Sequence, residues 1–305
     1  MDPVANAAAG LRRLAAFTLT APDVAVVAQA YQHWLDYVIA GDTVVSAALA
    51  GAWNCPALAG RRMLLLHAAG APQTTLRLQE TPGPADQHAL PGHGWNAMEL
   101  LVRDPYALAD ELQGSPFRVI IPPRPLPFDA DIHAMQVIGP AGELLYMTAL
   151  PANKTILDLT AARSRVDRPF IAILGAPDAA AALSFYSQLL LTPVIAPSPT
   201  IVQIINESFG LPADHRVLLG IVKLPRDALI EVDGMPAAAR PRPRRDGELP
   251  AGIAMVSFEC ASLDALSARW LQPARALQEA PYRGRRAAVA VGAAGEWIEL
   301  IEAGR

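Results

Sequence analysis

The sequence predicts an α+β fold made of four copies of one βαβββ unit. Three observations support this prediction. A short apolar strand, a helix-capping side chain and a helix recur in the same order four times along the chain. After each helix, strands follow one another directly, which favours α+β over an alternating α/β sheet. The last strands of the second and fourth units follow glycine-containing turns at 140–142 and 293–295.

The start of each unit is the best-defined part of the repeat. Runs of Ala, Val, Ile, Leu, Phe and Thr fit a half-buried strand. Each run ends on a side chain whose oxygen can cap a helix. The four capping residues are Asp23, Asp104, Asp178 and Ser262. The helices expected after them cover 24–38, 105–113, 179–190 and 263–271.

The repeat divides the chain into four modules and two domains. The modules are expected at 14–80, 94–150, 168–235 and 252–303. We expect the first module to pair with the second and the third with the fourth. This gives an N-terminal domain at 1–150, a linker at 151–167 and a C-terminal domain at 168–305. Two paired modules curl into a half-barrel whose cleft can hold a small molecule.

Composition limits the classes of function. Hydrophobic residues make up 52% of the 305 residues and charged residues 18%, enough apolar material for two cores. A formal net charge of −4 gives no electrostatic support for nucleic-acid binding. No apolar stretch is long enough to span a bilayer. Cys55 and Cys260 lack the spacing of a metal site or a disulfide framework. We therefore expect a cytoplasmic protein whose partner is a small molecule, and the sequence leaves a homodimer open.

The repeated segments resemble a known group of proteins. The openings TLTAPD, LLVRD and ILGAPD and the closings GELLYMT and GEWIELIE are similar to those of the vicinal oxygen chelate (VOC) superfamily. That superfamily includes glyoxalase I, bleomycin-resistance proteins and extradiol dioxygenases. The resemblance implies two half-barrel domains and covers nearly the whole chain. It does not specify a reaction, because these proteins carry out many different chemistries.

The resemblance also implies where a divalent metal would be held. One ligand, His, Gln or Glu, comes from each opening strand, seven residues before the capping residue. Another comes from each closing strand. The opening-strand positions are Ala16, Ala97 (or Asn96), Ile171 and Met255, and the closing-strand positions are Arg77, Tyr146, Glu231 and Glu299. Because no histidine stands at these positions, we expect no transition metal and no cofactor. Weak Mg²⁺ binding by two carboxylates stays open.

Glu231 and Glu299 are the predicted catalytic residues. Each interrupts an apolar closing strand and is expected to face one shared cavity, where burial and mutual repulsion suit acid–base chemistry. The alternative is that they face solvent or pair with an arginine such as Arg283, Arg285 or Arg286. Arg77 and Tyr146 are predicted to bind substrate in the N-terminal cleft. Their alternative is an arginine paired with a neighbouring Glu and a tyrosine in the core.

Aromatic side chains near the expected clefts are further candidates for substrate binding. They are Trp95, Phe209, Tyr282 and Trp297, and Trp53 also lies near an expected cleft. Trp297 precedes Glu299 by two residues and should share its strand face. The segment at 203–216 is long for a connection in this unit and could cover the C-terminal cleft.

Two classes of function follow from these residues. The first is a metal-independent lyase or isomerase that uses carboxylates to move protons on a small, largely apolar or aromatic molecule. The second is a protein that binds or sequesters such a molecule without catalysis. Pocket carboxylates with shifted pKa values favour the enzyme, and ion-paired carboxylates favour the binding protein. A metal-dependent dioxygenase or glyoxalase is the third hypothesis.

Overall fold

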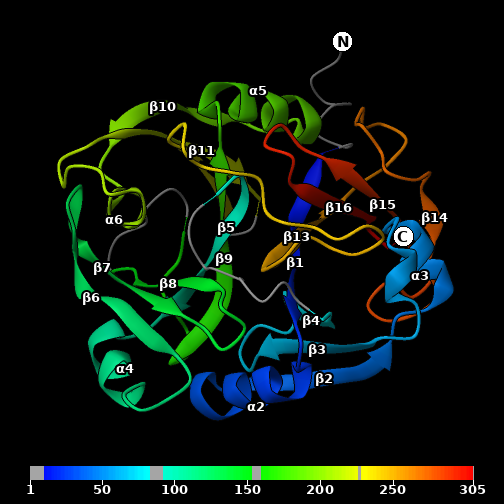
Figure 1. The fold of residues 1–305 in the computed structure, drawn as a ribbon, viewed down its shortest axis with the longest axis horizontal. Helices are drawn as coiled ribbons and strands as arrows, with labels where there is room; N and C mark the ends of the chain where they lie inside the picture. Colours follow the sequence, from blue (N-terminus) through cyan, green and yellow to red (C-terminus); the bar gives the residue numbers. More distant parts are fainter. Residues whose placement is uncertain (1–9, 83–91, 153–158, 226–227, 305) are drawn as a thin grey trace.

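Two curved eight-stranded sheets form the molecule (Figure 1). The computed structural model describes residues 10–82, 92–152, 159–225 and 228–304. Sheet A contains, in spatial order, β14 (Arg275–Ala276), β15 (Arg286–Val291), β16 (Trp297–Glu302), β13 (Ile253–Cys260), β1 (Leu11–Ala21), β4 (Thr75–Glu80), β3 (Arg62–Ala68) and β2 (Tyr37–Val44). Sheet B contains β10 (Val194–Thr200), β11 (Val217–Leu224), β12 (Ala228–Gly234), β9 (Val166–Ala176), β5 (Gly94–Val102), β8 (Leu144–Ala149), β7 (Asp129–Ile138) and β6 (Arg118–Leu126).

The predicted fold class, α+β with four modules in two half-barrels, is confirmed. In every module the opening strand runs parallel to the closing strand of the same module, as β1 does beside β4 and β5 beside β8. The helices are few and short. They are α2 (Val24–Leu35), α3 (Ala47–Ala52), α4 (Pro105–Glu111), α5 (Ala179–Leu190) and α6 (Gln203–Phe209), with one 3₁₀ turn, η1 (Pro56–Leu58).

The predicted pairing of the modules is wrong. The opening strand β1 pairs antiparallel with β13, and β5 pairs antiparallel with β9. The first module therefore joins the fourth, and the second joins the third. All four opening strands are apolar and largely buried, so their pattern did not indicate which partner each would take.

The predicted linker does not separate the two sheets in sequence. Residues 166–167 of the segment 151–167 already belong to β9, and residues 153–158 lie outside the described residues. Whether the chain divides there into units that fold independently stays a prediction.

Three of the four predicted helix starts are confirmed. Asp23, Asp104 and Asp178 each accept hydrogen bonds from backbone N–H groups of the first turn of α2, α4 and α5. These bonds give a partner to one or two of the backbone N–H groups that have none within the first turn of each helix.

No helix forms at 263–271, contrary to the prediction. The amide of Leu263 donates to the Glu302 carboxylate over 2.9 Å, and Trp270 bridges to Ala290 of β15. Tertiary partners thus take the backbone groups that a helix would use, and helix propensity is too weak to compete.

The segment 203–216 also differs from the expected loop. Its first half forms α6, which ends at Gly210 with φ 61°. This left-handed conformation favours glycine. Figure 1 shows α6 inside the curve of sheet B, on the left.

The apolar side chains form three cores. The largest lies between the two sheets and includes α2 and α5. The other two line the inner faces of the curved sheets. We call the inner face of sheet A cup A, with Met63, Met255 and Trp297 in its core. We call the inner face of sheet B cup B, with Ile173 and Leu229 in its core.

Two equivalent hydrogen bonds tie consecutive modules across the two sheets. The Tyr31 hydroxyl on α2 donates to Glu143 over 2.6 Å, and the Tyr186 hydroxyl on α5 donates to Glu296 over 2.7 Å. Each acid precedes a closing strand of the next module, β8 or β16. Modules one and two, and likewise modules three and four, are therefore linked through helix and turn, although the members of each pair lie in different sheets.

Candidate functional site

The four closing-strand residues define equivalent positions in the two cups. Each has a direct partner on the adjacent opening strand. The pairs are Thr18–Arg77, Glu99–Tyr146, Ile173–Glu231 and Ser257–Glu299. Because cross-strand partners point to the same side of a sheet, each pair marks one wall of a cup.

The opening-strand member of each pair lies five residues before the capping residue, a shift of two residues from the position, seven before it, that the resemblance implies. Two residues along each strand lie the positions given by the resemblance, Ala16, Ala97, Ile171 and Met255. Because side chains alternate between the two faces of a strand, these residues point to the same face as the members of the pairs. The alternative Asn96 instead accepts hydrogen bonds from the Gly92 amide and Arg242.

Glu99 was missed because of this shift. It is the single ionisable side chain in the strand 94–102, five residues before Asp104, and this signal could have identified it. The structure places it on the inner face of sheet B, beside Tyr146.

Cup A contains a closed cluster of hydrogen bonds around Arg77 and Glu299. Their guanidinium and carboxylate meet at 2.7 Å across the cup, although β1 and β13 separate their strands. The other carboxylate oxygen of Glu299 accepts from the Trp53 indole N–H over 2.8 Å and from the Tyr282 hydroxyl over 2.6 Å. Ser257 donates to Glu299 over 2.7 Å and also bonds Arg77.

This cluster is fully buried and neutral overall. Arg77 and Glu299 are both 0% exposed, and the guanidinium lies 5.2 Å from the centre of the Trp53 ring. Burial favours the neutral acid, but the Arg77 charge and its hydrogen bonds outweigh that effect and hold the pKa of Glu299 below its usual value. Glu299 is therefore a structural anion whose charge is already compensated.

Cup B carries a different set of groups at the equivalent positions. Glu99 accepts a hydrogen bond from Thr148 over 2.5 Å. Glu231 and Asp233 alternate along β12 with residues of the other face, so both point into cup B. Gln136 is the cross-strand partner of Tyr146. In the part of the chain that the structure describes, no Lys, Arg or His forms an ion pair with any of the three acids.

The three acids of cup B hold their protons unusually tightly. Burial raises the pKa of Glu99 to about 7. Burial, then the charge of Glu99, raises the pKa of Asp233 to about 7. Burial raises the pKa of Glu231 well above its usual value, and the charges of Asp233 and Glu99 raise it further. Like charges without a cation cannot all ionise near neutral pH.

Solvent reaches the inner face of sheet B but not the equivalent part of sheet A. Tyr146 and Glu231 are partly exposed, as are their inner-face neighbours Gln136 and Ile221. The equivalent residues of sheet A are buried. Cup A is filled by its own side chains, whereas cup B presents polar groups that a small molecule can contact.

The structure separates residues that the sequence analysis had grouped. Glu231 and Glu299 lie in different sheets, so the predicted shared cavity is wrong. Arg77 and Tyr146 are likewise in different cups. The opening strand of module one pairs with that of module four, and the opening strand of module two pairs with that of module three. Each closing strand follows its own opening strand into that sheet, so residues expected in one cleft lie in different cups.

The predicted aromatic residues fall into three places. Trp297 and Tyr282 lie in cup A, where Arg244 stacks 5.3 Å from the Trp297 ring centre. Trp297 shares the strand face of Glu299, as predicted. Phe209 of α6 packs against the core of cup B. Trp95 belongs to the core between the sheets and donates to the Trp297 carbonyl over 2.8 Å.

Two of the three arginines named as alternative partners of the acids bind elsewhere. Arg285 pairs with Glu259, and Arg286 pairs with Asp264 over 2.7 Å. Glu299 does pair with an arginine, but with Arg77, from a module far away in sequence.

The superfamily metal does not fit these residues. At the positions that the resemblance implies, cup A offers Ala16, Arg77, Met255 and Glu299, and cup B offers Ala97, Tyr146, Ile171 and Glu231. The cross-strand partners of the closing-strand residues add Thr18 and Ser257 in cup A and Glu99 and Ile173 in cup B. Within the described ranges, no three His, Cys, Asp or Glu side chains lie close enough together to hold a metal ion. These sets lack the nitrogen ligands that Fe or Zn prefer. The absence of a cofactor stays a prediction.

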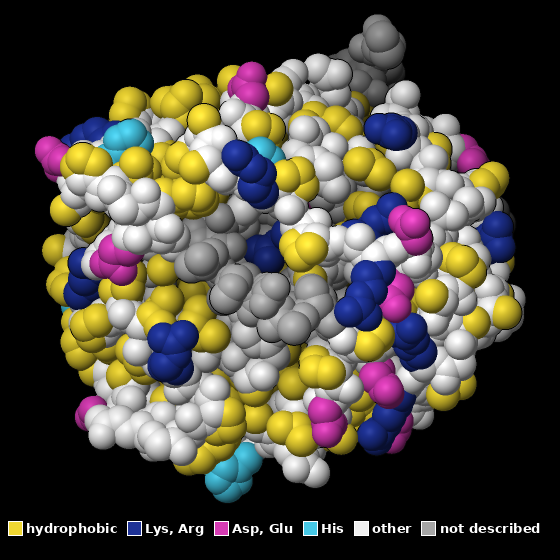
Figure 2. Space-filling view, in the orientation of Figure 1, with side chains coloured by type: hydrophobic (Ala, Val, Ile, Leu, Met, Phe, Trp, Pro, Cys, Tyr) yellow, Lys and Arg dark blue, Asp and Glu magenta, His cyan; other side chains and the backbone are white. Residues whose placement is uncertain are grey.

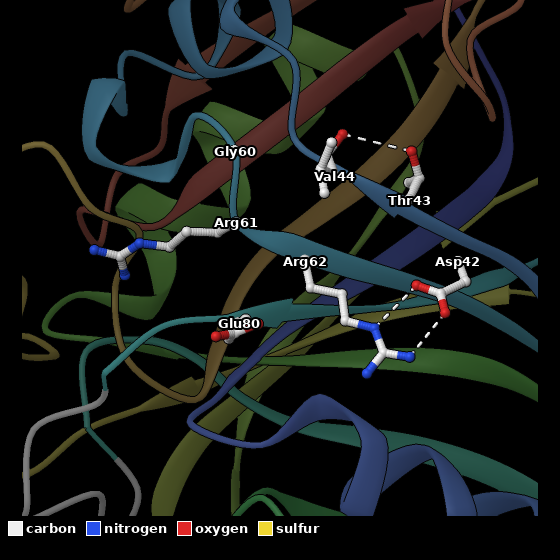
Figure 3. Close-up of a pocket in the computed structure, with 7 residues that line it drawn as sticks. All are labelled: Asp42, Thr43, Val44, Gly60, Arg61, Arg62 and Glu80. Atoms are coloured by element: carbon white, nitrogen blue, oxygen red, sulfur yellow. Dashed lines mark hydrogen bonds and ion pairs between the residues drawn. The ribbon is translucent and has the colours of Figure 1, made fainter.

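A surface hollow of about 650 Å³ lies at the edge of sheet A (Figure 3). Both of its arginines are already paired. Arg62 contacts Asp42 over 2.7 Å, and Arg61 contacts Glu248 over 2.9 Å. Figure 3 shows the two arginines pointing in different directions, so they do not converge on one ligand.

On the face shown in Figure 2, basic and acidic side chains stand side by side over the right half. Among the described helices, none is long and apolar enough to cross a membrane.

Comparison with solved structures shows the same architecture. Glyoxalase I from Zea mays superposes with a TM-score of 0.64 at 12% identity, covering 95% of this chain and 92% of that one. A putative dioxygenase from Bacillus subtilis has a TM-score of 0.62 at 11% identity, covering 96% and 86%. The chain has the glyoxalase I fold. No protein-family model matches the sequence, and no curated protein matches it in sequence. At such low identity the glyoxalase-like fold carries no information about the reaction.

Proposed function

We propose that cup B is the active site of a metal-independent isomerase or lyase, which moves a proton on a small, largely apolar or aromatic molecule. The observation that carries this proposal is Glu231. It is partly exposed on an apolar inner face, faces two further acids and has no basic partner among the described residues. A proton-transfer group works best when its pKa is near the working pH, and this environment moves Glu231 in that direction.

Each residue of the site has a role in such a reaction. Glu231 as a carboxylate takes the proton from a carbon next to a carbonyl group. Tyr146, the counterpart of Arg77 on the opposite wall, donates a hydrogen bond to the carbonyl oxygen as negative charge develops there. The protonated Glu231 then returns the proton to a second carbon, or to a leaving group on the neighbouring carbon. The first outcome is an isomerisation and the second is an elimination.

Cup A has a structural role in this proposal. Its carboxylate is ion-paired and its cavity is filled, so neither proton transfer nor ligand binding is assigned to Glu299, Arg77, Tyr282 or Trp297. The same distinction weakens the alternative of a purely sequestering protein, because the acids of cup B are not ion-paired.

The test starts from a metabolite panel screened by thermal shift, since a ligand of the native state raises its stability. Each hit is then incubated with the protein in D₂O, and deuterium incorporation is followed by NMR. Glu231→Gln should lower the exchange rate by roughly 10²–10⁴, and Asp264→Asn, on the surface, should leave it unchanged. Hits that bind but never exchange a proton would support the sequestering protein instead.

A further inference from the structure

Cup B holds several acids but no group that neutralises them. Glu99, Glu231 and Asp233 face the same space, and none forms an ion pair within the described residues. In cup A the equivalent acid, Glu299, has Arg77 at 2.7 Å. The same framework can therefore place a cation opposite this wall, and in cup B none of the described side chains does so.

Asp233 indicates that the missing partner is a ligand. Its side chain is only 2% exposed and points into cup B, where one carboxylate oxygen lacks a hydrogen-bond partner in the described structure. A buried polar group without a partner costs about 1–3 kcal/mol, so such groups are rare unless something else binds them. A donor from outside the chain would remove that cost.

The walls around the acids are apolar. Ile171, Ile173 and Leu229 stand beside Glu231 on the inner face, and Phe209 of α6 packs against the same core. A ligand that fills this space therefore needs a hydrophobic body in addition to its charged group.

The charge of the site excludes other ligand classes. An anionic ligand would bind only while all three acids stay protonated, because each acid that ionises repels it. A bare metal ion needs several ligands converging at about 2–2.6 Å. Within the described residues no three such side chains converge in this way.

We propose that cup B takes an apolar organic cation, an amine in its ammonium form, whose charge faces Glu99, Glu231 and Asp233 and whose N–H groups donate to Asp233, the acid with an unpartnered oxygen. This inference rests on the proposed function because it uses the same site, and it names the class of substrate. On binding, one of the acids releases its proton and becomes the counter-ion of the ammonium group, since burial and mutual repulsion disfavour the ionisation of all three. The reactive carbon then lies beside Glu231, and the apolar body contacts the walls.

The experiment compares matched probes with the full-length protein by isothermal titration calorimetry. Several alkyl and aryl amines are tested near neutral pH, each beside the alcohol and the carboxylate of the same carbon skeleton. Amines should bind about tenfold or more tightly than the alcohols, and the carboxylates should not bind. If no amine binds more tightly than its matched alcohol, the inference is overturned.

Two variants and one metal control locate the binding. Asp233→Asn and Glu99→Gln should each remove most of the preference for the amine without changing alcohol binding, whereas Asp264→Asn should change nothing. Thermal unfolding checks that each variant is folded. If Mg²⁺ alone binds and displaces the amine in the wild type but not in Asp233→Asn, the site is a metal site and the inference fails.

The result is separable from the proposed function. Amine-selective binding without deuterium exchange in any bound amine would keep the ligand class and remove the enzyme. Deuterium exchange in neutral ligands without amine selectivity would keep the enzyme and remove the ligand class.

Discussion

Cup A and cup B are built on equivalent strands but carry different side chains at the equivalent positions. In cup A the walls present Arg77 and Glu299, whose charges cancel beneath Trp53 and Tyr282. In cup B the walls present Tyr146 and Glu231, and nothing in the described residues neutralises the acid. Two equivalent sets of strands thus form two cups, of which one is filled by an ion pair and the other, among the described residues, holds an acid without a cation.

This difference identifies function more reliably than residue type does. Two glutamates at equivalent positions looked interchangeable in sequence. Their neighbours make one a buried ion-pair partner with a lowered pKa and the other a partly exposed acid with a raised pKa. An unpaired acid on an apolar wall costs folding free energy, which suggests that it is retained for a ligand.

The largest expected effect is the loss of the buried pair in cup A. Glu299→Gln leaves the Arg77 charge buried and unpaired, so the free energy of unfolding should fall by about 3–5 kcal/mol. Urea or guanidinium denaturation measures it. The double variant Arg77→Met, Glu299→Leu should recover much of the loss, because it removes both charges together.

The matched change in cup B should behave in the opposite way. Glu231→Gln removes a group that no cation in the described structure stabilises, so stability should stay within about 1 kcal/mol or rise. A loss equal to that of Glu299→Gln would remove the contrast between the cups.

The two cups should respond to opposite ends of the pH scale. Glu99 and Asp233 have folded-state pKa values of about 7, above their unfolded values. Their contribution to stability is therefore complete below the unfolded values and is lost as the pH rises through about 7. The pKa of Glu299 is lowered in the folded state, so its contribution is lost as the pH falls through that lowered value.

Unfolding free energies measured from pH 4 to pH 9 check this expectation. The wild type should lose on the order of 1–3 kcal/mol per cup B acid between about pH 5 and pH 8. The variant Glu99→Gln, Asp233→Asn should show a smaller loss. Part of the slope remains, because burial also raises the pKa of Glu143 and Glu296 to about 7. An unchanged slope in the variant would show that the acids of cup B titrate normally.

A smaller effect distinguishes the two tyrosines. Tyr282→Phe removes a hydroxyl that bonds both Arg77 and Glu299, so it should cost about 1–3 kcal/mol. Tyr146→Phe removes a hydroxyl with no hydrogen-bond partner in the described structure, and stability should change by about 0.5 kcal/mol or less. Its effect should appear in deuterium exchange instead. Equal stability losses in both variants would contradict the assignment of roles.

Sequence alone predicted the parts of the fold that are encoded locally. The strand, capping residue and helix of modules one to three each lie within one short segment, as for Asp178 and α5. The fourth helix failed because Glu302 and Ala290, which are distant in sequence, take its backbone groups. The pairing of the opening strands depends on contacts across the whole chain. The apolar pattern is the same in all four strands, so it does not indicate which two will pair.

The candidate site was predicted only in part, for the same reason. Strand alternation gave the correct face for Glu231 and Tyr146. An inner face repeats every two residues, however, so the pattern could not distinguish Ala97 from Glu99. The pairing of Arg77 with Glu299 joins two modules at opposite ends of the chain. No local spacing indicates such a contact.

The most direct test of the contrast is a ¹³C NMR titration of the side-chain carboxyl groups. The resonances are assigned with Glu231→Gln, Asp233→Asn and Glu299→Gln. We expect Glu231 to titrate well above the ordinary range of glutamate and Asp233 at about 7, while Glu299 stays ionised below pH 4.5. If Glu231 is ionised at pH 5, or if Glu299 is protonated at pH 7, cup B is not the unsatisfied site and the account is contradicted.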